Sequence, residues 1–184
     1  FPQSIHIATD AIALITNRQN TDSLIGIPVL KDILTGKIKD WEEFSTDNKS
    51  GKIEVVFDNP NSGTVRYAID SICSGEPLSG NLHAMRDNRQ VMDYVSKTPG
   101  ALGIIGVNLI SNPLDSTCMS FLDDIKVMAV SRYRNATVTN SFKPYQAYIA
   151  LKEYPMTRSV YLILSEPRMG LASGFTTFIT SDRG

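Results

Sequence analysis

The sequence predicts an α/β fold in which a mixed β-sheet is flanked by helices. Three observations favour this fold: short β-rich runs alternate with amphipathic helical stretches, no repeat or long linker divides the chain, and the composition is ordinary for a globular protein. Of the 184 residues, 42% are hydrophobic and 20% are charged. This length is sufficient for one sizeable hydrophobic core or for two small ones.

The first predicted strand and helix lie near the N-terminus. Residues 11–16 form an apolar run typical of a buried strand, and this run ends at the polar turn 17–22. A short helix is predicted between Pro28 and Gly36, because proline suits a first helical position and glycine suits a C-terminal cap.

A second strand is followed by a short loop and a helix. Residues 53–57 form the clearest strand, and residues 58–63 are dense in turn-forming side chains. From Thr64 the apolar spacing changes to the helical pattern i, i+3, i+4, i+7, i+8. The order strand, small polar loop, helix is therefore predicted here.

The remaining elements continue the alternation. Asp87 or Asn88 can cap a further helix, which the breaker at 98–100 ends. A buried strand is predicted at 101–107, where glycines allow close backbone approach. The last predicted strands share an apolar or aromatic composition and lie at 125–130, 145–151 and 160–164. Helices interleaved with strands indicate a sheet covered on both faces.

Composition and charge exclude several classes of function. The 18 basic and 19 acidic side chains give a formal net charge of -1, so nothing favours nucleic acid or a membrane surface as a partner. Two cysteines and two histidines lack the paired spacing of a zinc cluster, and no cofactor is expected. No run approaches the roughly 20 apolar residues of a membrane span.

Two features are left open by composition. Two cysteines alone do not decide whether Cys73 and Cys118 pair in a disulfide. The chain starts at Phe1 rather than at a methionine, and we interpret it as a processed or excised piece of a longer polypeptide.

The loop 61–64 is the best candidate for a binding site. Ligands of α/β sheets bind beyond the carboxyl ends of strands, and this loop joins such a strand to a helix. Ser62 and Thr64 offer hydroxyls, Gly63 allows close backbone approach, and the first free N–H groups of a helix attract an oxyanion. The alternative is that Ser62 or Thr64 only caps the helix.

No catalytic motif is present. The chain has no Gly-Lys-Ser/Thr phosphate-binding loop and no Gly-x-Ser-x-Gly nucleophile elbow. Neither histidine is placed beside a serine or cysteine by a motif. The chain is therefore not expected to be an enzyme.

Five segments, in order, resemble periplasmic phosphate-binding proteins, the solute receptors of phosphate ABC transporters. Residues 10–17 are similar to the Asp-Gly-Ile-Ala-Val-Val-Val-Asn strand of that family, and residues 34–41 to its Phe/Leu-Thr-Gly-Glu-Ile-x-x-Trp segment. Residues 62–64 match its Ser-Gly-Thr anion loop. Residues 98–103 resemble its Thr-Pro-Gly-Ala-Ile-Gly turn and strand, and residues 154–161 its Tyr-Pro-Leu-x-Arg-x-Leu-Tyr return strand.

The resemblance implies a type II periplasmic-binding-protein-like fold, in which two lobes close on phosphate. By this resemblance, residues 1–7 cross over from lobe 1 and residues 8–158 form lobe 2. Residues 159–184 then cross back to lobe 1 and form a helix there. The N-terminal part of lobe 1 is absent from the sequence.

The implied function is that of a solute-binding receptor lobe that binds inorganic phosphate for an ABC importer. The implied partners are phosphate and an inner-membrane ABC permease, and the lobe is expected to be a monomer. Its implied location is periplasmic or anchored to the cell envelope. Two alternatives from other classes are a phosphoester-acting enzyme domain and an oxyanion-sensing lobe of a signalling protein.

The residues assigned to substrate binding share one neighbourhood: Asp58, Asn61, Ser62, Gly63, Thr64 and Arg66. The chain departs from the resemblance at two cationic positions. Many members carry an arginine four residues before the loop serine, where this chain has Asp58, and others carry it directly after the threonine, where Val65 precedes Arg66. Asp58 either caps a turn or accepts a hydrogen bond from a protonated phosphate oxygen, which sulfate lacks.

Overall fold

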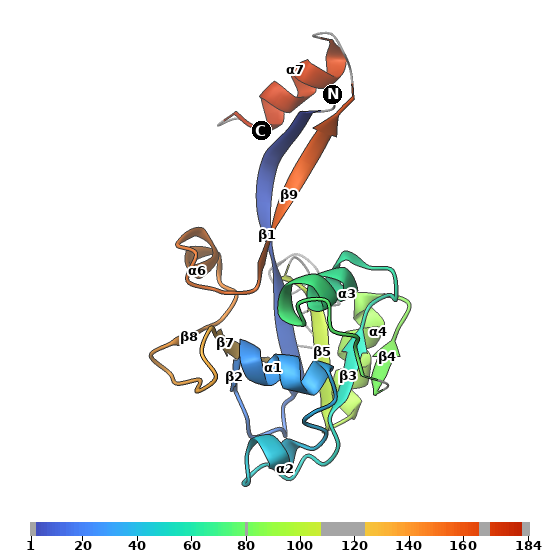
Figure 1. Cartoon of the computed structure of the whole chain (residues 1–184), viewed down its shortest axis with the longest axis vertical. Helices are drawn as coiled ribbons and strands as arrows, with labels where there is room; N and C mark the ends of the chain where they lie inside the picture. Colours follow the sequence, from blue (N-terminus) through green and yellow to red (C-terminus); the bar gives the residue numbers. More distant parts are fainter. Residues whose placement is uncertain (1–2, 80, 108–123, 166–169, 182–184) are drawn as a thin grey trace.

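The computed structural model describes residues 3–79, 81–107, 124–165 and 170–181. Figure 1 shows a compact body and an arm that projects from it. We define the arm as residues 3–9 with the described part of 159–181, and the body as the described residues between. Two strands, β1 (Gln3–Asn17) and β9 (Thr157–Leu164), run from one part into the other.

The body is built on a mixed sheet, as predicted. Its strand order is β4-β3-β5-β1-β6, with β3 at Glu54–Phe57, β4 at Leu82–Ala84, β5 at Ala101–Gly106 and β6 at Ile125–Val127. β3 is parallel to β4 and β5, whereas β1 is antiparallel to β5 and β6. The carboxyl ends of β3 and β5 therefore lie at the edge where β1 enters the body.

The body half of β1 forms the centre of the core. Its residues 11–17 are all buried, as a strand covered on both faces requires. Ile12 lies opposite Gly106, and Thr16 lies opposite Leu102. Asp10, two residues before Ile12, therefore lies just beyond the carboxyl end of β5.

Helices cover both faces of the sheet. Figure 1 shows α1 (Ile27–Leu34) and α3 (Gly63–Tyr67) in front of the sheet and α4 (Asn88–Lys97) behind it. The prediction that helices flank the sheet is confirmed. The short helix α2 (Trp41–Phe44) buries Trp41, whose indole N–H donates to the Gly100 carbonyl over 3.0 Å.

The predicted caps are present. Pro28 lies in the first turn of α1, and Gly36 adopts φ +76° just after its end, where only glycine is unstrained. Asp87 caps α4 by accepting a hydrogen bond from the Gln90 amide over 3.0 Å. These local signals explain why both helices begin and end where the sequence indicates.

Residues 125–130 form two strands rather than the single predicted strand. β6 pairs with β1, whereas β7 (Ala129–Ser131) pairs with β2 (Leu24–Gly26) and β8 (Ser141–Phe142) in a separate three-stranded sheet. Met128 lies between them, and its amide donates to the Leu14 carbonyl over 2.9 Å. The division reflects strand partners far away in the chain, which an apolar run does not specify.

The predicted strand at 145–151 is wrong, because this run contains a helix, α6 (Gln146–Ala150). Tyr145, Tyr148 and Ile149 have the spacing i, i+3, i+4, which places them on one side of a helix. The Tyr145 and Tyr148 rings lie 6.2 Å apart, and Tyr148 packs on Phe142 with a ring separation of 5.1 Å. The aromatic content indicated a strand, but the helical spacing prevailed.

The arm is a two-stranded ribbon with one helix. The N-terminal half of β1 pairs antiparallel with β9, with an irregularity between His6 and Ala8, and α7 (Leu171–Ile179) follows. The predicted strand at 160–164 is confirmed and begins earlier, at Thr157. Large apolar side chains of the arm are exposed: Ile163 by 70%, Leu171 by 91%, Phe175 by 57% and Phe178 by 56%. The described residues leave this apolar surface uncovered.

The junction of arm and body is held on the body side. The buried Tyr154 donates its hydroxyl to the Ile12 carbonyl over 2.6 Å, and the Ile12 amide donates to the Met156 carbonyl over 2.9 Å. β9 therefore leaves the body from a well-anchored starting point. The pairing of Cys73 with Cys118 is not addressed, because Cys118 lies outside the described residues.

Candidate functional site

The candidate loop follows β3 at the carboxyl edge of the sheet. Asp58 Oδ1 accepts a hydrogen bond from the Asn59 amide, and Asn59 Oδ1 accepts one from the Asn61 amide, both over 2.9 Å. The Ser62 amide donates to the Asn59 carbonyl over 3.0 Å. These local bonds fix a tight turn and bring the loop directly to the start of α3.

Ser62 is the N-cap of α3. Its Oγ accepts a hydrogen bond from the Val65 amide over 3.2 Å. α3 continues into the π-helical turn η1 (Ala68–Ile72), so one helical segment extends from Gly63 to Ile72. The Gly63 and Thr64 amides belong to the first turn, where a helix has no internal acceptors for its N–H groups. The capping role of Ser62 is thus observed, and its role towards a ligand stays a prediction.

The other predicted site residues surround this helix start in different environments. Asn61, Ser62 and Arg66 line a small cavity of about 230 Å³, together with Pro60, Val65, Ile69 and Asp70. Thr64 is buried and Gly63 is exposed. Asp58 is half-buried, and its Oδ2 has no hydrogen-bond partner among the described residues.

Arg158 lies beside the loop and was missed by the sequence analysis. A Cβ built on Gly63 would lie 2.8 Å from Arg158 Nη1 and 3.9 Å from its Cζ, so the Nη1 end of the guanidinium is directed at Gly63. Arg158 also forms an ion pair with Asp10, which lies opposite it in the β1–β9 pairing. A signal existed, because an arginine and an aspartate lie at the two places where the chain is expected to cross between lobes.

The surroundings of the loop contain further cationic groups. Burial raises the pKa of the Tyr67 hydroxyl, and the guanidinium groups of Arg132 and Arg158 oppose this shift. Arg132 donates to the Lys152 carbonyl over 2.7 Å. The start of α3 therefore faces an electropositive region, which suits an anion.

The two histidines lie elsewhere. His6 is on the arm, where its ring packs edge-on against Tyr161 at 5.5 Å. His83 Nε2 lies 4.0 Å from Glu54 Oε2, at the amino end of β3. Within the described ranges, no cluster of three or more His, Cys, Asp or Glu side chains is arranged to hold a metal ion.

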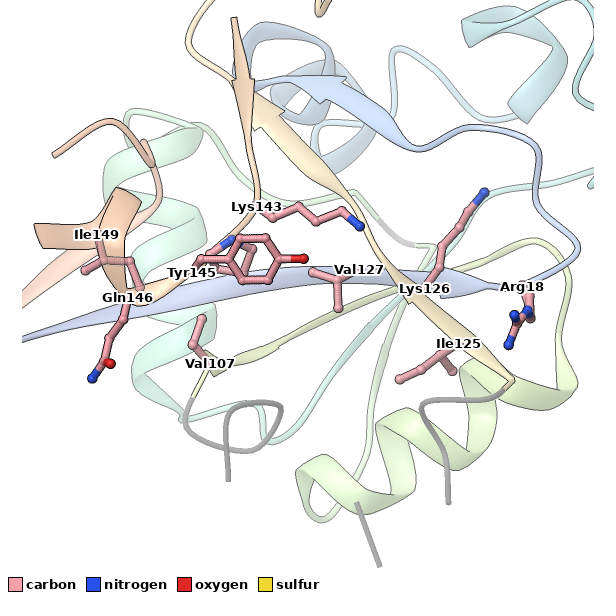
Figure 2. Close-up of a pocket in the computed structure, with 10 residues that line it drawn as sticks. Arg18, Val107, Ile125, Lys126, Val127, Lys143, Tyr145, Gln146 and Ile149 are labelled. Atoms are coloured by element: carbon pink, nitrogen blue, oxygen red, sulfur yellow. The ribbon is translucent and has the colours of Figure 1, made fainter. Parts of the chain in front are cut away.

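A larger cavity of about 810 Å³ lies along the β6 edge of the sheet, as Figure 2 shows. Its walls carry apolar side chains such as Val127 and Ile149, and three cations: Arg18, Lys126 and Lys143. Burial lowers the pKa of Lys126, and its ammonium donates to the Asn20 carbonyl. The lining does not include any residue of the loop 61–64.

A comparison with known families decides the identity of this fold. The model of the PBP superfamily domain matches residues 2–183. The chain belongs to this family. Residues of the PBP superfamily domain that the structure describes contain no helix long and apolar enough to cross a membrane.

Curated relatives of this PBP superfamily domain include two phosphate-binding proteins called PstS. The Bacillus subtilis (strain 168) protein is 31% identical over 157 residues, which cover 83% of this chain and 44% of the relative. The Staphylococcus aureus (strain USA300) protein is 24% identical over 183 residues, which cover 97% and 51%. The chain thus spans about half the length of the curated relatives it matches.

Solved structures show the same fold. An ABC-type phosphate transport receptor from Vibrio cholerae superposes with a TM-score of 0.75 at 19% identity, covering 98% of this chain and 67% of that one. A putative phosphate ABC transporter substrate-binding protein from Clostridium perfringens, solved with bound phosphate, gives a TM-score of 0.72 at 24% identity, with coverages of 100% and 67%. The predicted family resemblance and fold class are confirmed.

Proposed function

We propose that this PBP superfamily domain is part of a receptor that binds inorganic phosphate and delivers it to an ABC permease. The observation that carries the proposal is the Ser62-Gly63-Thr64 loop, which lies at the carboxyl edge of the sheet, at a helix start and beside Arg158. The names of the relatives, phosphate-binding protein PstS, support phosphate as the anion.

The chemistry of the loop fits an oxyanion. The first-turn amides of Gly63 and Thr64 act as donors, and the Ser62 hydroxyl can donate its hydrogen while its oxygen caps the helix. Asn61 and Arg66 contribute from the neighbouring cavity. Asp58 Oδ2 can accept a hydrogen bond from a protonated phosphate oxygen, since its Oδ1 is occupied by the turn.

The proposal includes the division into lobes. Residues 8–158 form one lobe, and residues 1–7 and 159–184 belong to the other. The exposed Ile163, Phe175 and Phe178 of the arm support this division, since such side chains are normally covered. The complete receptor acts as a monomer outside the cytoplasmic membrane, in the periplasm or anchored to the cell envelope.

The rival hypothesis of a phosphoester-acting enzyme predicts turnover. Both histidines lie away from the loop, so neither can activate a nucleophile there. Incubation with a generic phosphoester should release no product. A signalling lobe would use the same anion site, and association with a purified ABC permease in membranes would favour transport over sensing.

Two substitutions at Ser62 test the anion site. Asp and Asn both cap helices as well as Ser does, so Ser62→Asp and Ser62→Asn should keep the stability of the chain. Only Asp adds a negative charge, and like charges about 4 Å apart repel by roughly 1–4 kcal/mol from water to a protein surface. In phosphate titrations followed by NMR, Ser62→Asp should bind about tenfold or more weakly than Ser62→Asn. Equal affinities would show that the anion binds elsewhere.

A further inference from the structure

Asp10 and Arg158 form a pair across the two strands that join the arm to the body. They are 148 positions apart in sequence and lie directly opposite each other in the β1–β9 ladder. Arg158 Nε and Nη2 donate to Asp10 Oδ2 over 2.9 and 2.6 Å. Asp10 Oδ1 accepts the Ala11 amide over 2.8 Å, so both carboxylate oxygens are occupied.

The guanidinium retains donors that nothing in the described part of the chain uses. Its Nη1 has no printed acceptor there, and this atom lies closest to Gly63, 2.8 Å from the position of a Cβ. The side chain is 32% exposed and that of Asp10 27%, so the pair is partly desolvated. A planar guanidinium held on one side by a carboxylate presents its remaining N–H groups in a fixed direction.

The position supplies the charge that the sequence analysis did not find. The chain has Asp58 and Val65 at the two loop positions where a cation was sought. Arg158 reaches the loop instead from the strand that leaves the body. A glycine at position 63 leaves room for this approach, because a side chain there would meet the guanidinium.

We propose that Arg158 is a cationic ligand of the anion site and that Asp10 is a positioning residue that orients it. This inference rests on the proposed function. Because Arg158 and Asp10 belong to the strands that enter the arm, an anion bound to Nη1 also stabilises the pairing of those strands. Anion binding and strand pairing at this junction are therefore linked, and each strengthens the other.

Substitution of Arg158 tests the direct contact. The 184-residue chain is titrated with inorganic phosphate up to tens of millimolar, and the amide signals of the loop are followed by NMR. Loss of a charge-assisted hydrogen bond in Arg158→Gln should weaken binding about ten- to hundredfold. Arg158→Lys keeps the charge but not the fork, and should fall between Arg158→Gln and the parent chain.

Asp10→Asn separates orientation from charge. Removal of a nearby negative charge by itself favours an anion, so a purely electrostatic effect would tighten phosphate binding. Loss of orientation should instead weaken it, and it should abolish the phosphate-induced protection of amides 158–160 from hydrogen exchange. Tighter binding by Asp10→Asn would overturn the positioning role.

A matched control is the second arginine–aspartate pair, between Arg134 Nη1 and Asp32 Oδ2 at 2.8 Å. Arg134→Gln removes the same charge and a similar ion pair, and it should leave phosphate affinity unchanged. If Arg158→Gln and Arg158→Lys both bind phosphate as the parent chain does, Arg158 is not a ligand and the proposed function stands. If the parent chain shows no phosphate-dependent shift in the loop, the proposed function and this inference both fail.

Discussion

Ser62 illustrates how one side chain can serve a helix and a ligand together. Its oxygen accepts the Val65 amide, while its hydroxyl hydrogen is free to be donated to an anion in front of the helix. Replacement by alanine would remove both roles, because a lost cap costs about 1 kcal/mol of stability and a lost ligand contact lowers affinity. Substitutions that keep the cap are therefore the informative ones at this position.

Asp58 determines anion selectivity if its free oxygen faces the ligand. Asp58→Asn keeps an acceptor for the Asn59 amide and turns the other carboxylate oxygen into a donor. We expect sulfate to gain affinity relative to phosphate, because sulfate has no proton to offer a carboxylate but can accept from an amide. Competition titration with both anions measures the ratio. An unchanged preference would restrict Asp58 to its role in the turn.

At the scale of elements, the contact between β5 and α4 depends on one glycine. A Cβ on Gly103 would lie 2.7 Å from Ile15 Cγ1, 2.9 Å from Val95 Cγ2 and 3.0 Å from Val91 Cγ1. Gly103 thus lets β1, β5 and α4 approach closely in the middle of the core. The loop 61–64 is held by the same sheet, so its position depends on this packing.

Gly103→Ala should lower the free energy of unfolding by about 1–3 kcal/mol, because three buried side chains must move to accommodate one methyl group. Chemical denaturation followed by circular dichroism measures the loss. Gly174→Ala in α7 is the matched control: nothing lies within 4 Å of its Cβ, and alanine favours a helix by up to about 1 kcal/mol. Equal stability of Gly103→Ala and the parent chain would contradict the packing.

At the scale of the whole molecule, the arm differs from the body in how it is stabilised. A two-stranded ribbon is marginal in water unless it packs on further structure, and the apolar side chains of the arm are largely exposed. Amides of the arm strands should therefore exchange with solvent much faster than those of β3 and β5. Hydrogen exchange measured by NMR tests this expectation. Comparable protection in both parts would mean that the arm is stabilised by contacts outside the described residues.

Phosphate affinity is also a property of the whole molecule. The chain matches about two thirds of the solved phosphate receptors, so part of the surroundings of the anion is missing. An anion bound to one wall keeps much of its water, and the loop amides act in a high dielectric. We expect weak binding, and calorimetry that gives a submicromolar dissociation constant for this chain would contradict it.

Local patterns were sufficient for most of the body and for part of the site. The buried run 11–16, the cap at Asp87 and the turn before Ser62 each depend on residues close in sequence. Propensity, capping and periodicity act over a few residues, and for this reason the strand–loop–helix order around Ser62 could be predicted.

Long-range pairing decided the rest. The run 125–130 divides because its two halves pair with β1 and β2, and Tyr145 to Leu151 contains a helix because Tyr148 finds Phe142. Arg158 reaches Gly63 only because β9 returns beside β1, which places Asp10 opposite it across 148 positions. Such contacts arise from the three-dimensional path of the chain, and a pattern that extends over a few neighbouring residues carries no information about them.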